Sequence, residues 1–146
     1  MIPELNTVGE LPPGIHPTTL DELETIFANT PERRPLFEGL KLALENLTSA
    51  RVHRVFIDGS FVTHKAEPND VDGCWEWHEG VDLNRLAPVF LDFSNQRQAM
   101  KAKYGVDFFI ADWVEAGSGL TFLQFFQRNR SDEPRGILAI DLRELP

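Results

Sequence analysis

Cysteine is almost absent from this chain of 146 residues, since Cys74 is its only one. A single thiol cannot form an internal disulfide, which favours a reducing compartment. The sequence opens with "MIPELNTVGELPPGIHP" and lacks the basic start and apolar segment of a signal peptide. Apolar runs of membrane-spanning length are lacking as well. We therefore expect a cytoplasmic protein with no membrane among its partners.

Basic residues are also scarce. Lys and Arg number 14 against 23 Asp and Glu, so the formal net charge is −9. Proteins that hold duplex DNA or tRNA on a broad basic surface gain most of their affinity by neutralising phosphates. The charge disfavours that class, although it leaves open a nucleotide that arrives with its own metal ion. Eleven Phe and three Trp argue against disorder.

The hydrophobic pattern indicates one domain with a mixed architecture. Residues 1–17 are rich in proline and show no period, so they are predicted to form an extended arm lying on the domain or on a partner. Residues 18–146 form the predicted single domain. Helical spacing of apolar residues predicts helices at 20–28, 31–47, 83–93, 94–104 and 118–130. β-branched and aromatic runs predict strands at 52–58, 70–78, 106–113 and 136–142. This order is typical of an α+β fold with a small mixed β-sheet and helices mainly on one face.

Two aspartates stand out in the stretch "FIDGSFVTHKAEPNDVDGCWEW". Alternate side chains of a strand share a face, so Asp70 and Asp72 point to one side. Val71, Trp75 and Trp77 are expected to point to the other side, into a core. Two carboxylates on one face repel each other unless they face water or bracket a hard divalent cation, which also keeps them ionised.

The residues before this pair can provide a site for phosphate groups. Gly59 and Ser60 follow a predicted strand, and glycine allows the backbone to come close to a ligand. The free N–H groups of the following turn attract phosphate, and the Ser60 hydroxyl adds a donor. Lys65 can reach the same anion as a flexible charge. His64 is a further candidate for a phosphate contact, although a histidine there is more often a surface residue.

Gly59-Ser60, nine intervening residues and Asp-Val-Asp resemble the signature of the DNA polymerase beta-like nucleotidyltransferase superfamily. The likeness is to its minimal, single-domain branch, and the whole chain is similar to short prokaryotic proteins assigned there. That superfamily has a third carboxylate on a later strand, often after a hydrophobic residue, and "GVDFF" matches it at Asp107. The resemblance implies a nucleotidyltransferase-like fold. It also implies that Asp70 and Asp72 bind two Mg²⁺ or Mn²⁺ ions, and that Asp107 helps to hold the ion that activates an acceptor hydroxyl.

The resemblance further implies that a nucleoside monophosphate moves from a nucleoside triphosphate, ATP among them, to an acceptor. The acidic balance favours a protein side chain as acceptor over an RNA end. So small a domain leaves the site open, which predicts a homodimer or a protein partner. By analogy with other minimal members, this partner could belong to a toxin–antitoxin pair. The alternative is a catalytically idle fold that binds nucleotides or neutralises a partner. In its favour, the chain has "FVTHK" after Gly59-Ser60, where many minimal members carry an arginine.

The choice between Asp107 and Asp112 as the third carboxylate follows from strand geometry. Five residues apart on one strand, the two side chains point to opposite faces. Asp112 shares its face with the more aliphatic side chains and lies near the end of the predicted strand, where a cap or a salt bridge is the ordinary use. We therefore expect Asp107, and not Asp112, within metal-bridging reach of Asp70 and Asp72.

Overall fold

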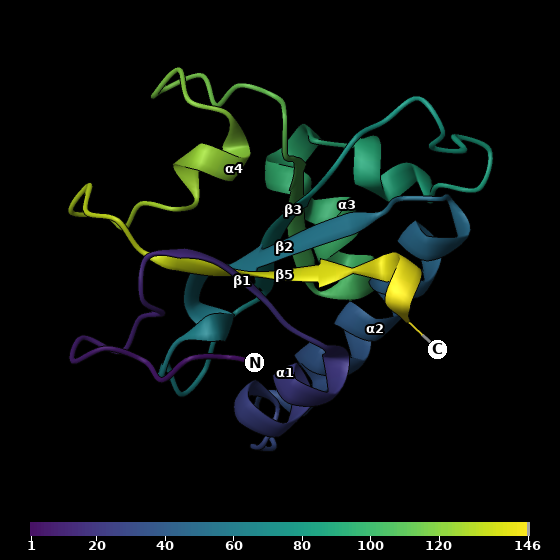
Figure 1. Ribbon diagram of the computed structural model, residues 1–146. Coiled ribbons are helices and arrows are strands. Elements are labelled where there is room, and N and C mark those ends of the chain that lie inside the picture. The colour runs from purple at the N-terminus through teal and green to yellow at the C-terminus, as the bar shows by residue number, and fades with distance from the viewer. Residues whose placement is uncertain (146) are drawn as a thin grey trace.

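A five-stranded mixed sheet organises the chain in the computed structural model, which describes residues 1–145 (Figure 1). The strands are β1 (Gly14–Pro17), β2 (Arg54–Asp58), β3 (Val71–Trp75), β4 (Val106–Ile110) and β5 (Gly136–Asp141). Their order in the sheet is β1-β5-β2-β3-β4. The two outer pairs are parallel, and the two inner pairs are antiparallel. The sequence-based expectation of an α+β fold with a mixed sheet is confirmed.

Three of the helices contribute to one face of this sheet. They are α1 (Leu20–Phe27), α2 (Arg34–Ser49) and α3 (Ser94–Tyr104), whose buried apolar residues all join the same core cluster. The short α4 (Phe122–Phe125) contributes instead to the other face, and Figure 1 shows it at the upper left, away from α1 and α2. Three 3₁₀ turns complete the structure: η1 (Gly59–Val62), η2 (Pro88–Leu91) and η3 (Leu142–Glu144). Within residues 1–145, every helix is too short or too polar to cross a membrane.

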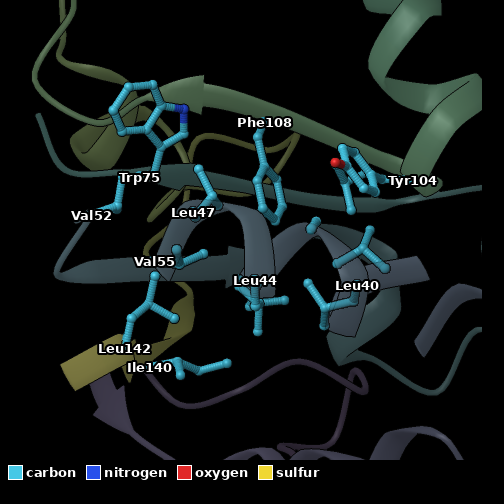
Figure 2. Packing of buried hydrophobic residues seen from close by; sticks show 14 of the residues in the cluster. Leu40, Leu44, Leu47, Val52, Val55, Trp75, Tyr104, Phe108, Ile140 and Leu142 are labelled. Carbon is cyan, nitrogen blue, oxygen red and sulfur yellow. The ribbon is translucent and has the colours of Figure 1, made fainter. Parts of the chain in front are cut away.

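The main core lies between α2 and the sheet. Leu40, Leu44 and Leu47 recur at helical spacing on α2 and are fully buried. Figure 2 shows them facing Val55 of β2 and Phe108 of β4. Because side chains alternate along a strand, Val55 and Phe108 present one face to the helices and leave the other for different contacts.

A second and smaller core covers part of the opposite face. Its buried members are Phe56, Cys74, Ala111, Ile137 and Ala139, with Phe109, Leu123 and Phe126 packed against them. Cys74 is thus a small buried apolar side chain. The cluster occupies only part of its face, and the rest is left for the polar site described below.

The predicted helix at 118–130 is wrong, because only Phe122–Phe125 is helical. Thr121 caps this single turn with a capping box. Beyond it, the side chain of Asn129 accepts hydrogen bonds from the amides of Ser131 and Glu133, which turns the chain back instead of extending a helix. Arg128 and Arg130 therefore belong to a loop and not to the end of a helix.

Three other expectations need adjustment. Residues 83–93 form turns and η2 instead of a helix, and Pro88 opens that 3₁₀ turn. Trp77 is 39% exposed and lies outside the core, because β3 ends at Trp75. The segment predicted as an arm contributes β1, whose Gly14–Pro17 pairs with β5 at the sheet edge. Leu11, just before it, is buried.

Candidate metal centre

Three aspartates form a row across the neighbouring strands β2, β3 and β4. Asp72, the second residue of β3, pairs with Asp58 at the end of the antiparallel β2. It also pairs with Asp107, the second residue of the parallel β4. Alternation along each strand puts these side chains on the face of Phe56 and Cys74, opposite the helices. The strand register therefore brings together, at one end of these three strands, carboxylates from distant parts of the sequence.

Asp70 joins this row from the residue that precedes β3. One carboxylate oxygen each from Asp70, Asp72 and Asp107 lies within 4.8 Å of the other two. Such a set of oxygens suits a hard divalent cation, which carboxylates bind by preference. Asp112 is exposed and lies outside this group. The structure thus brings together the aspartates expected from the sequence and leaves out the one expected to be remote.

Asp58 is a member of the row that sequence reasoning missed. It is only 1% exposed, and within the described residues neither of its carboxylate oxygens has a hydrogen-bond partner. Its place directly before Gly59, at the end of a strand, was visible in the sequence. Its pairing with Asp72 was not, because that depends on the register between β2 and β3.

The electrostatics of the row favour a cation. The pKa of Asp72 is raised to about 7, first by burial and then by Asp70 and Asp107. The pKa of Asp58 is raised well above its ordinary value, again by burial first and then by Asp72 and Asp107. A divalent ion among these carboxylates would relieve both effects, because it favours the ionised form of each. The residues present, with the unpartnered oxygens of Asp58 among them, therefore fit a metal ion.

Asp107 differs from the other aspartates of the row because basic side chains already neutralise the negative charge of its carboxylate. Arg97 donates from Nε to Oδ1 at 2.7 Å and from Nη2 to Oδ2 at 3.0 Å. Lys101 Nζ lies 3.6 Å from Oδ2. Arg97 also lies over the Phe109 ring, 4.9 Å from its centroid. No sequence signal identified this partner, since Arg97 reaches Asp107 from α3.

The start of α3 has an unusual backbone that places Arg97. Asn95, Gln96 and Arg97 adopt left-handed conformations, with φ of 51°, 57° and 59°. Such angles cost free energy in residues other than glycine. The hydroxyl of Ser94, the first residue of α3, donates to Asp92. The bidentate pair with Asp107 is one interaction that offsets the cost.

The Gly59-Ser60 turn lies against the acid row. Gly59 has φ +73° and opens η1 directly after β2. A Cβ atom at this position would collide with the carboxylate of Asp72. Glycine is therefore required here for two reasons: a left-handed backbone and the close approach of a metal-binding candidate.

A buried arginine holds this turn from the helix side. Arg33 is 5% exposed, and its guanidinium lies over the rings of Phe27 and Phe61. Its guanidinium donates to the carbonyl oxygens of Phe27, Ser60, Phe61, Thr63 and Lys65. Burial lowers its pKa. Because most of these acceptors lie in residues 60–65, Arg33 fixes the path of the segment that follows Gly59.

A cleft of about 840 Å³ contains the row and the turn together. Five of the site residues predicted from the sequence line this cleft: Gly59, Ser60, Lys65, Asp72 and Asp107. Three further arginines, Arg128, Arg130 and Arg135, line the cleft and are called its basic wall, and Arg97 lines it beside its partner Asp107. The cleft thus brings carboxylates and guanidinium groups together, an arrangement suited to a metal ion and a phosphate chain.

His64 is the one predicted site residue that the structure leaves apart from the acids. It lines a different cavity, of about 440 Å³, together with Phe27, Arg33 and Leu5. Its ring lies near Gly9 of the N-terminal segment. Lys65 lines both cavities, so it remains close to the cleft.

Comparison with known proteins places the chain in one family. It belongs to the family described as "Family of unknown function (DUF6932)", which matches residues 3–141. The match takes in the whole sheet and all the aspartates of the row. No curated protein matches the chain, and no solved structure does.

Proposed function

We propose that this protein is a metal-dependent nucleotidyltransferase that moves a nucleoside monophosphate from a nucleoside triphosphate to an acceptor hydroxyl. The observation that carries the proposal is the convergence of Asp70, Asp72 and Asp107 within 4.8 Å, with Asp72 and Asp107 in the same cleft as the Gly59-Ser60 turn. This arrangement gives one site for divalent cations and an adjacent one for phosphate. The sequence resemblance to minimal members of the DNA polymerase beta-like superfamily supports the same assignment.

The acidic residues have the role of metal ligands in this proposal. Asp70, Asp72 and Asp107 would hold Mg²⁺ or Mn²⁺ through their carboxylate oxygens. Bound there, the ions would lower the pKa of the acceptor hydroxyl and neutralise charge on the phosphates. The acceptor oxygen would lose its proton to water and bond to the α-phosphorus, while the bond from that phosphorus to the β-phosphate oxygen breaks and pyrophosphate leaves. No side chain needs to act as a covalent nucleophile. Arg97 donates to both oxygens of Asp107 and therefore competes with a metal ion for that carboxylate.

The turn and the basic wall would bind the triphosphate. Backbone N–H groups near Gly59 and the hydroxyl of Ser60 are suited to donate to phosphate oxygens. Lys65, Arg128 and Arg135 line the same cleft and add positive charge. Since the chain as a whole carries a net charge of −9, this local basic wall suits a compact anion better than a long nucleic acid.

The acceptor in this proposal is a protein side chain, with an RNA end as the alternative substrate. The protein would act in the cytoplasm, as a homodimer or with a protein partner of the toxin–antitoxin type. The net charge supports the protein acceptor, because RNA binding gains affinity from basic surface.

The test is a transfer assay with labelled nucleotides. The protein would be incubated with Mg²⁺ or Mn²⁺, each α-³²P-labelled nucleoside triphosphate and a cell lysate. We expect label in one protein band, resistant to ribonuclease. An Asp70→Asn, Asp72→Asn double variant should lose at least about 10³-fold in rate, since metal and charge stabilisation supply most of such catalysis. Asp112→Asn is the matched control and should retain the activity. Equal labelling by wild type and double variant would refute the proposal.

A second function is favoured by one specific observation, the bidentate pair of Arg97 and Asp107. A chain that keeps this pair closed would bind nucleotides or a partner without transferring anything. Arg97→Gln separates the two functions. In an active enzyme, Arg97→Gln should raise the metal affinity, because Asp107 becomes free. An idle fold would transfer no nucleotide, whether residue 97 is arginine or glutamine. Calorimetry with Mn²⁺ and a nonhydrolysable triphosphate gives the affinity, and the labelling assay gives the rate.

A further inference from the structure

Charge compensation is unequal along the row of aspartates. Asp107 has Arg97 and Lys101 within ion-pair distance. Among residues 1–145, Asp58, Asp70 and Asp72 form no ion pair. The uncompensated negative charge of the row therefore lies on the side of β2 and β3, away from Asp107.

Asp58 is the side chain of the row that is buried most completely without a partner. Both of its oxygens are buried and without a hydrogen-bond partner among the described residues. A carboxylate in such a place costs several kcal/mol if it is ionised and unpaired. Asp58 also lines the same cleft as Asp72. An unpartnered acid at the wall of a polar cleft is in the right place to meet a ligand that enters it.

The geometry gives Asp58 and Asp72 a common direction. They are direct partners on antiparallel strands and lie on one face, so their Cβ atoms are about 5 Å apart. Gly59 lets the Asp72 carboxylate lie against the turn that follows Asp58. Asp58 lies outside the group of oxygens within 4.8 Å of one another, which Asp70, Asp72 and Asp107 supply. Because Asp58 and Asp72 are direct strand partners, a turn of the Asp58 carboxylate toward Asp72 would let both supply oxygens to one ion, and Asp70, beside Asp72, can supply a third.

We propose that Asp58 and Asp72 bind a divalent cation before any nucleotide arrives, and that Asp58 is a direct ligand of this ion. Asp70 completes the protein ligands on the open side of the site, and water fills the remaining positions. Asp107 joins the centre only after Arg97 gives way. The inference rests on the proposed function for the use of the ion in transfer, whereas the existence of the site rests on burial and charge alone.

Titration with Mn²⁺ in the absence of nucleotide tests this site. Electron paramagnetic resonance of the wild type should show about one tightly bound Mn²⁺ per chain. Asp58→Asn has the same shape without the charge and should weaken this binding at least about tenfold, the size of loss seen even for supporting residues of metal sites. Asp112→Asn is the control, and its affinity should match that of the wild type. If Mn²⁺ binds equally to wild type and Asp58→Asn, or binds to neither, the inference is wrong.

A measurement on the wild type covers the case in which Asp58→Asn fails to fold. Protein with ¹³C-labelled aspartate carboxylates would be titrated with Mg²⁺ and followed by NMR. The Asp58 and Asp72 signals should shift together at one Mg²⁺ per chain, while the Asp107 signal moves less. A shift of Asp107 without Asp58 would overturn the inference.

The two proposals fail in different ways. If nucleotide-free Mn²⁺ binding depends on Asp58 but no label is transferred, the site stands and the proposed function falls. If label is transferred with undiminished dependence on Asp70 and Asp72, but Asp58→Asn binds Mn²⁺ like wild type, the function stands and this site falls.

Discussion

The face of the sheet that packs on α2 buries apolar side chains along its whole length, whereas the opposite face changes from one end to the other. Strand β2 displays the contrast. Val55 and Ile57 point to the helices and are both fully buried. On the other face, Phe56 is buried in a small apolar cluster, but Asp58, two residues further, is buried as an unpartnered acid.

Equal burial has opposite consequences for stability at these positions. Burying an aliphatic side chain stabilises the fold by about 1.5–3 kcal/mol. Burying a carboxylate without partners costs free energy instead. The cost falls where strands β2, β3 and β4 meet a cleft lined by both acidic and basic side chains. Because uncompensated charges concentrate at functional sites, we infer that the fold retains this acid for a ligand.

The largest effect is expected at Arg33, which links the helix side to the site. Arg33→Met would leave several buried carbonyl oxygens, those of Phe61 and Thr63 among them, without their donor. We expect a loss of about 3–5 kcal/mol in the free energy of unfolding. The neighbouring Arg34 is an exposed control whose partners are surface glutamates, and Arg34→Met should cost less than about 1 kcal/mol. Urea denaturation measures both, and similar losses would show that Arg33 does not hold the turn.

The next effect compares one leucine from each face. Leu44 on α2 is fully buried in the main core, and Leu44→Ala should cost about 3 kcal/mol. Leu123 on α4 is only partly buried against the smaller cluster, and Leu123→Ala should cost about 1 kcal/mol. Thermal and chemical unfolding give both values. Equal losses would mean that the second face is as firmly packed as the first.

Sequence periodicity predicted the first face well. The helical spacing of Leu40, Leu44 and Leu47 fixes which side chains of α2 are buried, because burial there follows a simple period. The second face has no such period. In residues 118–130, Asn129 and the capped turn at Thr121 determine the path, and these local hydrogen bonds override the apolar stripe that predicted a helix.

The site divides in the same way. Asp70, Asp72 and Asp107 could be found from the sequence, because spacing within strands and resemblance both point to them. Asp58 and Arg97 could not be found in this way. The role of Asp58 depends on its pairing with Asp72 across the sheet, and the role of Arg97 depends on its contact from α3 with Asp107. Strand register depends on how two strands pair, so the sequence of one strand alone does not show which residues lie opposite each other.

Dependence of stability on pH sharpens the contrast further. Asp72 has an ordinary pKa of 3.8 that the fold raises to about 7, and the pKa of Asp58 is raised as well. The native protein therefore binds more protons than the unfolded chain between these values, so its free energy of unfolding falls as pH rises through this window. We expect a loss on the order of 2 kcal/mol in metal-free protein.

The control for this pH effect is Asp72→Asn, in which the slope should be smaller. Saturating Mn²⁺ should also reduce it in wild type, because the ion stabilises the ionised carboxylates. Unfolding by urea at several pH values in buffer with a chelator gives the slope. A free energy of unfolding that rises between pH 4 and 7, or an unchanged slope in Asp72→Asn, would contradict the assignment of these groups.

The smallest effect is expected at the far end of the polar face, where an acid has a full partner. Arg54 donates to Glu76 from Nε at 2.8 Å and from Nη2 at 2.7 Å, and its guanidinium lies over Phe56. Both side chains remain partly exposed, at 46% and 27%, so water and salt screen the pair. Arg54→Met keeps an apolar stem over Phe56 and should cost less than about 1 kcal/mol, with less loss at high salt.

Arg54 lies four residues from Asp58, about 13 Å along the strand, and screening over that distance should leave the Mn²⁺ affinity unchanged. Urea unfolding at low and high salt, together with the Mn²⁺ titration, checks both expectations. A loss above about 2 kcal/mol, or a weaker metal affinity, would mean that charge is coupled along the whole polar face and that Asp58 is not a separate site.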